Sequence, residues 1–217
     1  MQDAYLRATR CLDADHPRIR AFAREAVGGE TDAVTCAVRL YYAVRDGLRY
    51  DPYGLELSAE GLQASGVLAR GRGWCVAKAG VLAATARTVG IPARLGFADV
   101  RNHLATPRLL ELMGTDVFYY HGYTELLLDG RWVKATPAFN IELCRKFGVR
   151  PLEFDGRTDA IFHPFDASGR RHMEYLRDRG TRDDMPVEEL REALARLYAG
   201  IADWPASGDF HAEAEKA

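Results

Sequence analysis

The stretch that decides the fold is residues 71–79, which read Gly-Arg-Gly-Trp-Cys-Val-Ala-Lys-Ala. Cys75 stands at the point where a glycine-containing loop gives way to a helix. A cysteine in the first turn of a helix meets the positive end of the helix dipole and unpaired backbone N–H groups, which favour the thiolate and can hold an oxyanion. We interpret Cys75 as a nucleophile, against the alternative of a buried structural cysteine.

The helix that Cys75 opens is predicted to lie in the core. Residues 76–89 are rich in alanine and apolar nearly all round, as in a helix that is packed on every side. Gly90 stands where a glycine commonly ends a helix, and Pro92 cannot continue it.

Downstream of this helix, hydrophobic residues recur at every second position. The pattern predicts strands over residues 93–100, 119–128 and 131–135, with a tight hairpin turn at Asp129-Gly130. Residues 101–116 form a polar, partly helical insertion between the first two strands.

The flanking segments are mostly helical. Helices are expected near 19–26, 33–46 (capped by Asp32), 60–64 (capped by Ser58), 141–147 and 187–198, with a turn-rich stretch at 48–54 and irregular chain up to residue 184. Within that irregular chain, 154–156 and 163–166 are expected to cover a cleft. Helices followed by a largely antiparallel sheet indicate one α+β domain over residues 1–217, with a core at about 31–140 and an extension at 141–217 covering the core or cleft.

Composition narrows the class of protein. The chain has 217 residues, 47% of them hydrophobic, and its 29 basic and 31 acidic residues give a net charge of −2. This balance predicts no nucleic-acid partner, and the absence of an 18-residue apolar run predicts no membrane span. The N-terminus lacks a signal-peptide pattern, so a cytoplasmic location is expected.

The four cysteines are scattered without a C-x-x-C pair, which predicts neither a zinc site nor a disulfide framework. No cluster of His, Asp or Glu has metal-ligand spacing, and no cofactor is expected. The C-terminal helix carries an apolar stripe that packs either on its own core or on a second subunit, which leaves a homodimer open.

His121 is the best candidate for the base that a thiol nucleophile needs. It opens a strand whose hairpin partner follows directly, so its imidazole is held on rigid elements. The alternative is an ordinary histidine at the end of a strand.

Several ordered blocks resemble the transglutaminase-like superfamily. Residues 71–79 followed by 87–94 (Arg-Thr-Val-Gly-Ile-Pro-Ala-Arg) are similar to its cysteine motif, and residues 121–125 followed by 129–133 to its histidine motif. The resemblance extends upstream through residues 40–50 and covers about 31–140. It implies a papain-like core, with the nucleophile helix packed on an antiparallel sheet, and chemistry through a thioester acyl-enzyme. It implies no organic cofactor, and no acidic loop calls for calcium.

The sequence departs from the family pattern at the third member of the triad. The family usually has an aspartate four residues after the tryptophan of the third strand, and here that position is Thr136. A threonine hydroxyl can orient an imidazole but cannot stabilise its charge. Asn140 is the alternative orienting residue, as in a Cys-His-Asn arrangement. Either residue could equally be structural.

Four further residues are candidates for substrate binding. Asp99 and His103 leave the strand that should border the cleft and could contact a substrate, although such residues are more often solvated loop residues. Trp74 and Tyr50 stand near the motifs and could assist an oxyanion or belong to the core.

The predicted function is cysteine-dependent acyl transfer on a small-molecule or peptide amide or thioester, most simply amide hydrolysis. An amine acceptor would instead give amide formation or transamidation by the same residues. The third possibility is a transglutaminase-like binding module without catalysis.

Overall fold

The structure is a computed structural model that describes residues 2–103, 105–161, 169 and 172–215, and therefore leaves the predicted cover at 163–166 outside the described residues. The helices are η1 (Gln2–Tyr5), α1 (Pro17–Val27), α2 (Ala33–Gly47), α3 (Ala59–Leu62), α4 (Ala64–Arg70), α5 (Cys75–Thr88), α6 (Pro107–Met113), α7 (Ile141–Phe147), α8 (Val187–Leu197), η2 (Ile201–Asp203) and α9 (Phe210–Ala214). The strands are β1 (Arg49–Tyr50), β2 (Arg72–Gly73), β3 (Ala93–Asn102), β4 (Val117–Leu128), β5 (Arg131–Ala135) and β6 (Met173–Arg182).

Short-range sequence signals set several of these boundaries. The Asp32 carboxylate accepts a hydrogen bond from the Thr35 N–H at 2.8 Å and caps α2, as expected. The Ser58 hydroxyl accepts from the Gly61 N–H at 2.9 Å and caps α3. Such side-chain oxygens satisfy donors that the first helical turn leaves unpaired. The predicted caps of these two helices are confirmed.

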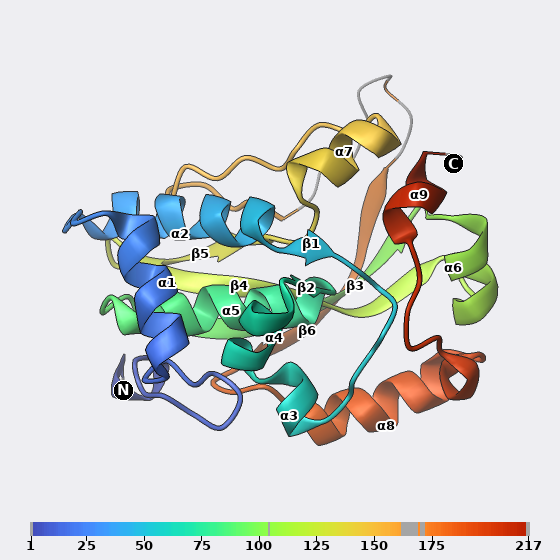
Figure 1. Cartoon of the computed structure of the whole chain (residues 1–217), viewed down its shortest axis with the longest axis horizontal. Coiled ribbons are helices and arrows are strands. Elements are labelled where there is room, and N and C mark those ends of the chain that lie inside the picture. Colours follow the sequence, from blue (N-terminus) through green and yellow to red (C-terminus); the bar gives the residue numbers. More distant parts are fainter. Residues whose placement is uncertain (1, 104, 162–168, 170–171, 216–217) are drawn as a thin grey trace.

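Helix α5 is the central element of the fold. Every residue from Cys75 to Arg87 is buried, which confirms the prediction of a core helix. It packs against α1, α2 and α4 on one side and against β3 and β4 on the other (Figure 1). The Thr124 hydroxyl on β4 donates to the Ala79 carbonyl of α5 at 2.9 Å, so helix and strand are also tied by a polar contact.

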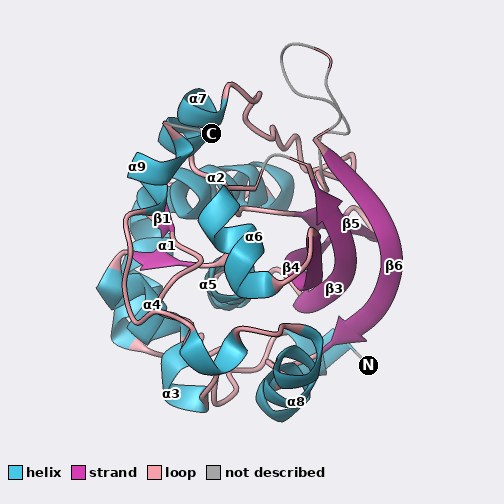
Figure 2. Ribbon diagram, turned by 90° about the vertical axis from the view of Figure 1, so that its right-hand side faces the viewer, coloured by secondary structure: helices cyan, strands magenta, loops and turns pink. Residues whose placement is uncertain are grey.

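The main sheet has the strand order β5-β4-β3-β6, and its neighbouring strands are antiparallel. Asp129 and Gly130 have φ of 48° and 76°, the positive pair that a two-residue type I′ hairpin turn requires. The sheet is strongly curved, and the helices lie on one side of it (Figure 2). The α+β class with a nucleophile helix on an antiparallel sheet is therefore confirmed.

Strand β6 corrects the expectation of an irregular chain up to residue 184. This strand pairs with β3 at the edge of the sheet. Its sequence, Met-Glu-Tyr-Leu-Arg-Asp-Arg-Gly-Thr-Arg, is highly charged, most of its residues are exposed or half-buried, and its pairing shifts twice. An exposed edge strand with bulges has no regular alternation, so period-two analysis misses it.

The C-terminal residues 198–215, which we call the C-terminal arm, run from α8 past the loop after β1 (Figure 1). The Trp204 indole N–H donates to the Pro52 carbonyl at 2.9 Å. The Gly54 N–H donates to the Pro205 carbonyl at 2.8 Å. Phe210 packs its ring against Tyr50 at a centroid distance of 5.7 Å. The arm is therefore fixed to the segment that leads into β1 and away from it.

In the part of the chain that the structure describes, no helix is both long enough and apolar enough to cross a membrane.

Candidate active site

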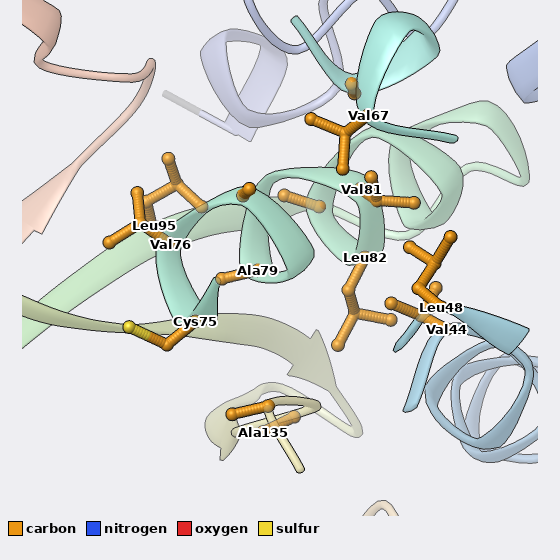
Figure 3. Packing of buried hydrophobic residues seen from close by; sticks show 14 of the residues in the cluster. Val44, Leu48, Val67, Cys75, Val76, Ala79, Val81, Leu82, Leu95 and Ala135 are labelled. Atoms are coloured by element: carbon orange, nitrogen blue, oxygen red, sulfur yellow. The ribbon is translucent and has the colours of Figure 1, made fainter. Parts of the chain in front are cut away.

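Cys75 is the first residue of α5, and its side chain lies among the buried residues of the core (Figure 3). The N-cap residue is Trp74, whose side chain makes no capping hydrogen bond. The first-turn N–H groups of α5 therefore have no side-chain acceptor from their own cap. The backbone N–H groups of Gly122 on β4, of Val76 and of Cys75 itself act on the sulfur. This is a cradle of donors around one thiol.

Gly122 allows β4 to approach the start of α5 this closely. A Cβ at this position would stand 2.7 Å from the Val76 Cα and 2.9 Å from its Cγ2. These distances are shorter than side-chain contacts in folded proteins. The glycine that follows His121 therefore sets the spacing between the strand of the histidine and the helix of the cysteine.

His121 lies on β4, is 2% exposed, and lines two small cavities. The first cavity is shared with Cys75 and the second with Thr136. The histidine thus stands between the thiol and the residue at the position of the family's aspartate. This is the order that a nucleophile, its base and an orienting group require.

Both reactive groups are neutral at pH 7. Burial raises the pKa of the Cys75 thiol to about 11, although the N–H groups of Gly122 and Val76 act in the opposite direction. Burial lowers the pKa of the His121 imidazole to about 3. The N–H groups at the helix start favour the thiolate, as expected, but in this closed form burial outweighs them and keeps the thiol protonated.

Thr136 and Asn140 differ in where they lie. Thr136 directly follows β5, is 4% exposed, and lines the second cavity with His121. Its hydroxyl oxygen has no hydrogen-bond partner among the described residues. The Asn140 side-chain oxygen instead accepts from the Tyr50 N–H at 3.0 Å, and Asn140 lines neither cavity. Thr136 therefore lies near His121, whereas Asn140 forms a structural hydrogen bond with β1.

The predicted substrate-binding residues divide in the same way. Tyr50 and Trp74 line the cavity of Cys75. Asp99 and His103 line neither of the two cavities around His121. Asp99 is buried in an ion pair with Arg179, and the His103 imidazole stands 3.7 Å from the Glu174 carboxylate.

Residues from distant segments complete the cavity of Cys75. Its remaining lining is apolar or aromatic and comes from the loop after β1, from α6, β4 and α8, and from the C-terminal arm: Pro52, Leu55, Leu109, Met113, Phe118, Tyr119, Leu194, Tyr198 and Trp204. Burial raises the pKa of the Tyr50 and Tyr198 hydroxyls, and both side chains line the same cavity as Cys75. No local motif marks these residues, because only the fold brings them together.

The cavity of Cys75 has a volume of about 30 Å³. Ligand sites usually measure ~300–1,000 Å³, and one water needs at least ~10–15 Å³. The described form is therefore closed over the thiol. Two aromatic side chains of the C-terminal arm, Tyr198 and Trp204, stack at a centroid distance of 5.8 Å in the lining. The Tyr198 hydroxyl accepts from the Tyr119 N–H at 2.8 Å, which fastens the arm to β4.

Among the described residues, no group of three or more His, Cys, Asp or Glu side chains is placed to hold a metal ion.

The buried helix that begins with a cysteine, packed on an antiparallel sheet that carries a histidine, defines the architecture of papain-like thiol enzymes. The model of one family, the transglutaminase-like superfamily, matches residues 20–137. The chain belongs to this superfamily, which confirms the resemblance in its cysteine and histidine motifs.

Solved structures of similar fold include a provisionally assigned cysteine protease from Cytophaga hutchinsonii, with a TM-score of 0.51 and 16% identity. The alignment covers 83% of this chain and 46% of that one. A provisionally assigned protease from Parabacteroides distasonis aligns with a TM-score of 0.39 and 14% identity, over 58% of this chain and 26% of that one. This chain thus spans less than half of either protein. No curated protein matches its sequence.

Proposed function

We propose that the protein is a cysteine-dependent acyl-transfer enzyme that cleaves an amide through a thioester acyl-enzyme, with water as the acceptor. One observation carries the proposal: Cys75, at the start of α5, shares a cavity with His121, and backbone N–H groups of α5 and β4 lower the pKa of its thiol. Family membership and the papain-like fold support a cysteine enzyme, and the finer reaction is inferred from the site.

The neutral state of both groups favours a proton transfer that accompanies the attack. As the Cys75 sulfur bonds to the substrate carbonyl carbon, its proton passes to His121. The imidazolium then protonates the leaving amine as the C–N bond breaks and the thioester forms. Water attacks the thioester, gives one proton to His121, and releases the carboxylic acid, while that proton returns to the thiol.

The negative oxygen that forms on the carbonyl needs preorganised donors. The Val76 and Gly122 N–H groups act on the sulfur in the closed form, one from α5 and the other from β4. An acyl carbon bonded to that sulfur would place its oxygen beside the same donors. The Thr136 hydroxyl, which has no hydrogen-bond partner among the described residues, is available to orient the imidazole during the reaction, and as a neutral group it adds no charge stabilisation.

The lining of the Cys75 cavity supports an uncharged acyl group. Apart from the cysteine and the histidine, it consists of apolar or aromatic side chains with no Asp, Glu, Lys or Arg. A carboxylate in this lining would lose its hydration without gaining a cationic partner. We therefore infer a substrate whose acyl side is apolar, either a small-molecule amide or an apolar residue of a peptide.

The second cavity supports water as the acceptor. It also has a volume of about 30 Å³, room for one or two waters, and both His121 and Thr136 line it. An amine with a side chain of its own would need more space there. Amide formation with an amine is the alternative that shares the same residues, and a binding module without catalysis is the other.

The test uses two thioesters that differ in one terminal group. Wild-type protein and the Cys75→Ala variant are incubated with S-phenyl thiobutyrate or with mono-S-phenyl thiosuccinate, and intact mass is followed over time. We expect a butyryl adduct in the wild type, no adduct in the variant, and much slower labelling by the charged thiosuccinate. A butyryl adduct that persists in Cys75→Ala contradicts the assignment of the nucleophile.

The fate of the adduct separates the alternatives. We expect it to decay to butyrate in buffer, with millimolar methylamine diverting only a minor share. Transfer mainly to methylamine would favour the amide-forming reaction. The binding module would be favoured if the wild type formed no adduct with any uncharged thioester in a series of acyl groups of different size. The same result would have to hold for a variant in which the contacts of the C-terminal arm are weakened.

A further inference from the structure

The pairing of β3 with both of its neighbouring strands is irregular around Asp99. On the β4 side, Ala98 pairs with His121 and Val100 pairs with Phe118. One residue of β3 therefore faces two residues of β4, which is a β-bulge. The bulge lies directly before the histidine.

On the other side of β3 the neighbouring strand β6 also bulges. Phe97 pairs with Gly180 and Ala98 pairs with Asp178, so Arg179 is the extra residue. Bulges are common next to active sites, where they re-aim a side chain. This β6 bulge lies between Phe97 and Ala98, and a second one, between Asp99 and Val100, has Leu176 as its extra residue.

The Asp99 carboxylate binds Tyr120 of the β4 bulge and Arg179 of the first β6 bulge. Its Oδ1 accepts from the Tyr120 N–H at 3.2 Å. The Arg179 guanidinium donates through Nε at 3.0 Å to each oxygen and through Nη2 at 2.7 Å to Oδ2. The same guanidinium lies 4.7 Å from the centre of the Tyr120 ring. One buried carboxylate thus fixes the strand on each side of it.

Tyr120 is the residue that needs this support. Its φ is +54°, in the left-handed region that a side chain with a Cβ rarely adopts. Its hydroxyl donates to Glu189 of α8 at 3.1 Å, which holds the ring at the other end. A strained backbone of this kind persists only where its surroundings fix it, and such sites cluster around active centres.

We propose that Asp99 is the positioning residue of the candidate base: together with Arg179 it holds Tyr120 in the bulge and thereby sets the place of His121. If the bulge closed, the chain on one side of it would shift by one residue, and its side chains would turn to the other face. The assignment rests on the proposed function, because it matters for catalysis only if His121 is the base. In this proposal Asp99 has a positioning role, whereas the sequence led us to expect a substrate contact.

The fold offers a matched control for this carboxylate. Glu125 also lies on the β3–β4 pair, its side chain is 6% exposed against 7% for Asp99, and it forms an ion pair with Arg94 at 2.6 Å. No bulge lies beside it, since Arg94 and Glu125 pair in regular register. Removing Glu125 therefore tests the loss of a buried ion pair without the loss of the bulge.

The experiment measures the rate of Cys75 acylation by S-phenyl thiobutyrate, well below the unfolding midpoint of each variant. We expect Asp99→Ala to lower the rate at least about tenfold, because a misplacement of ~1 Å can cost ~100-fold. Glu125→Ala should stay within about twofold of the wild type. In the Asp99→Ala background, Tyr120→Gly should restore most of the rate, since glycine adopts a positive φ without strain.

A merely structural ion pair would not give this pattern. Adding His121→Ala to Asp99→Ala should cause little further loss, because both changes disable the same base. The proposal is overturned if Asp99→Ala acylates like the wild type while His121→Ala does not, or if the two losses multiply. If Asp99→Ala fails to fold, Asp99→Asn with Glu125→Gln gives the same comparison. Equal rates for wild type and His121→Ala would instead refute the proposed function.

Discussion

The substitution Gly122→Ala tests the closest contact in the candidate site. The added methyl group would stand 2.7 Å from the Val76 Cα, a backbone atom in the first turn of α5 that no rotamer change can move. To reach ordinary contact at 3.4 Å, strand and helix have to separate by about 0.7 Å. The Gly122 N–H, which acts on the sulfur, is retained. The change therefore alters the spacing between helix and strand without removing any reacting group.

Two effects follow from this separation. Overpacking of a tight core commonly costs ~1–3 kcal/mol, so we expect the free energy of unfolding to fall by that amount. A displacement approaching 1 Å between nucleophile and base can cost up to ~100-fold in rate, so Cys75 acylation should fall by about 10- to 100-fold.

The assay pairs urea unfolding with intact-mass acylation kinetics at 25 °C. The control is Gly47→Ala at the end of α2, where a Cβ would meet nothing within 4 Å. The control should match the wild type in acylation and gain up to ~1 kcal/mol in stability, because alanine restricts the unfolded chain. If Gly122→Ala equals the wild type in both stability and acylation, the spacing account is refuted.

Three other predictions concern charge, orientation and access. Burial lowers the pKa of Lys78 to about 7, so between about pH 7 and 10.5 the unfolded state binds more protons than the folded state and stability rises with pH. In urea unfolding between pH 7 and 8.5, Lys78→Met should lose this rise. The variant should also lose ~2–4 kcal/mol of stability at pH 8.5, because two carbonyls at the end of α2 lose their hydrogen-bond donor. Thr136→Asp should place a carboxylate beside His121, raise the pKa of its imidazole by ~1–3 units and speed alkylation of Cys75 at neutral pH; an unchanged pH–rate profile would argue against Thr136 as the orienting residue. Trp204→Ala should open the closed cavity and speed iodoacetamide labelling of Cys75 about tenfold without changing the other three cysteines, and equal acceleration of all four would indicate general loosening instead.

The sequence predicts the part of the fold whose pattern is local. Residues 75–88 read as a core helix because they are apolar on every side, and 131–135 read as a strand because Asp129-Gly130 marks its hairpin turn. Cys75 could be singled out because it begins the core helix, and His121 because it lies on a strand of the predicted hairpin, although it stands inside β4 and does not open that strand as expected. Their shared cavity is consistent with that interpretation.

The remainder depends on contacts that no local pattern contains. Strand β6 is exposed and bulged, so its alternation is lost. Tyr198 and Trp204 reach the thiol only because the chain returns after α8. Asp99 lies near the end of a predicted strand and was expected to contact the substrate, whereas its partner Arg179 is 80 residues away in sequence. The protonation of Cys75 also depends on burial, which the closed cavity imposes.

The most direct test of the central claim is the rate at which S-phenyl thiobutyrate acylates Cys75, measured by intact mass with peptide mapping in the wild type and in His121→Ala. General base catalysis contributes ~10²–10⁴-fold, so the account predicts a butyryl group on Cys75 and a loss of at least ~100-fold in the variant. Equal rates in the two proteins, or a butyryl group mapped to Cys11, Cys36 or Cys144, would contradict it.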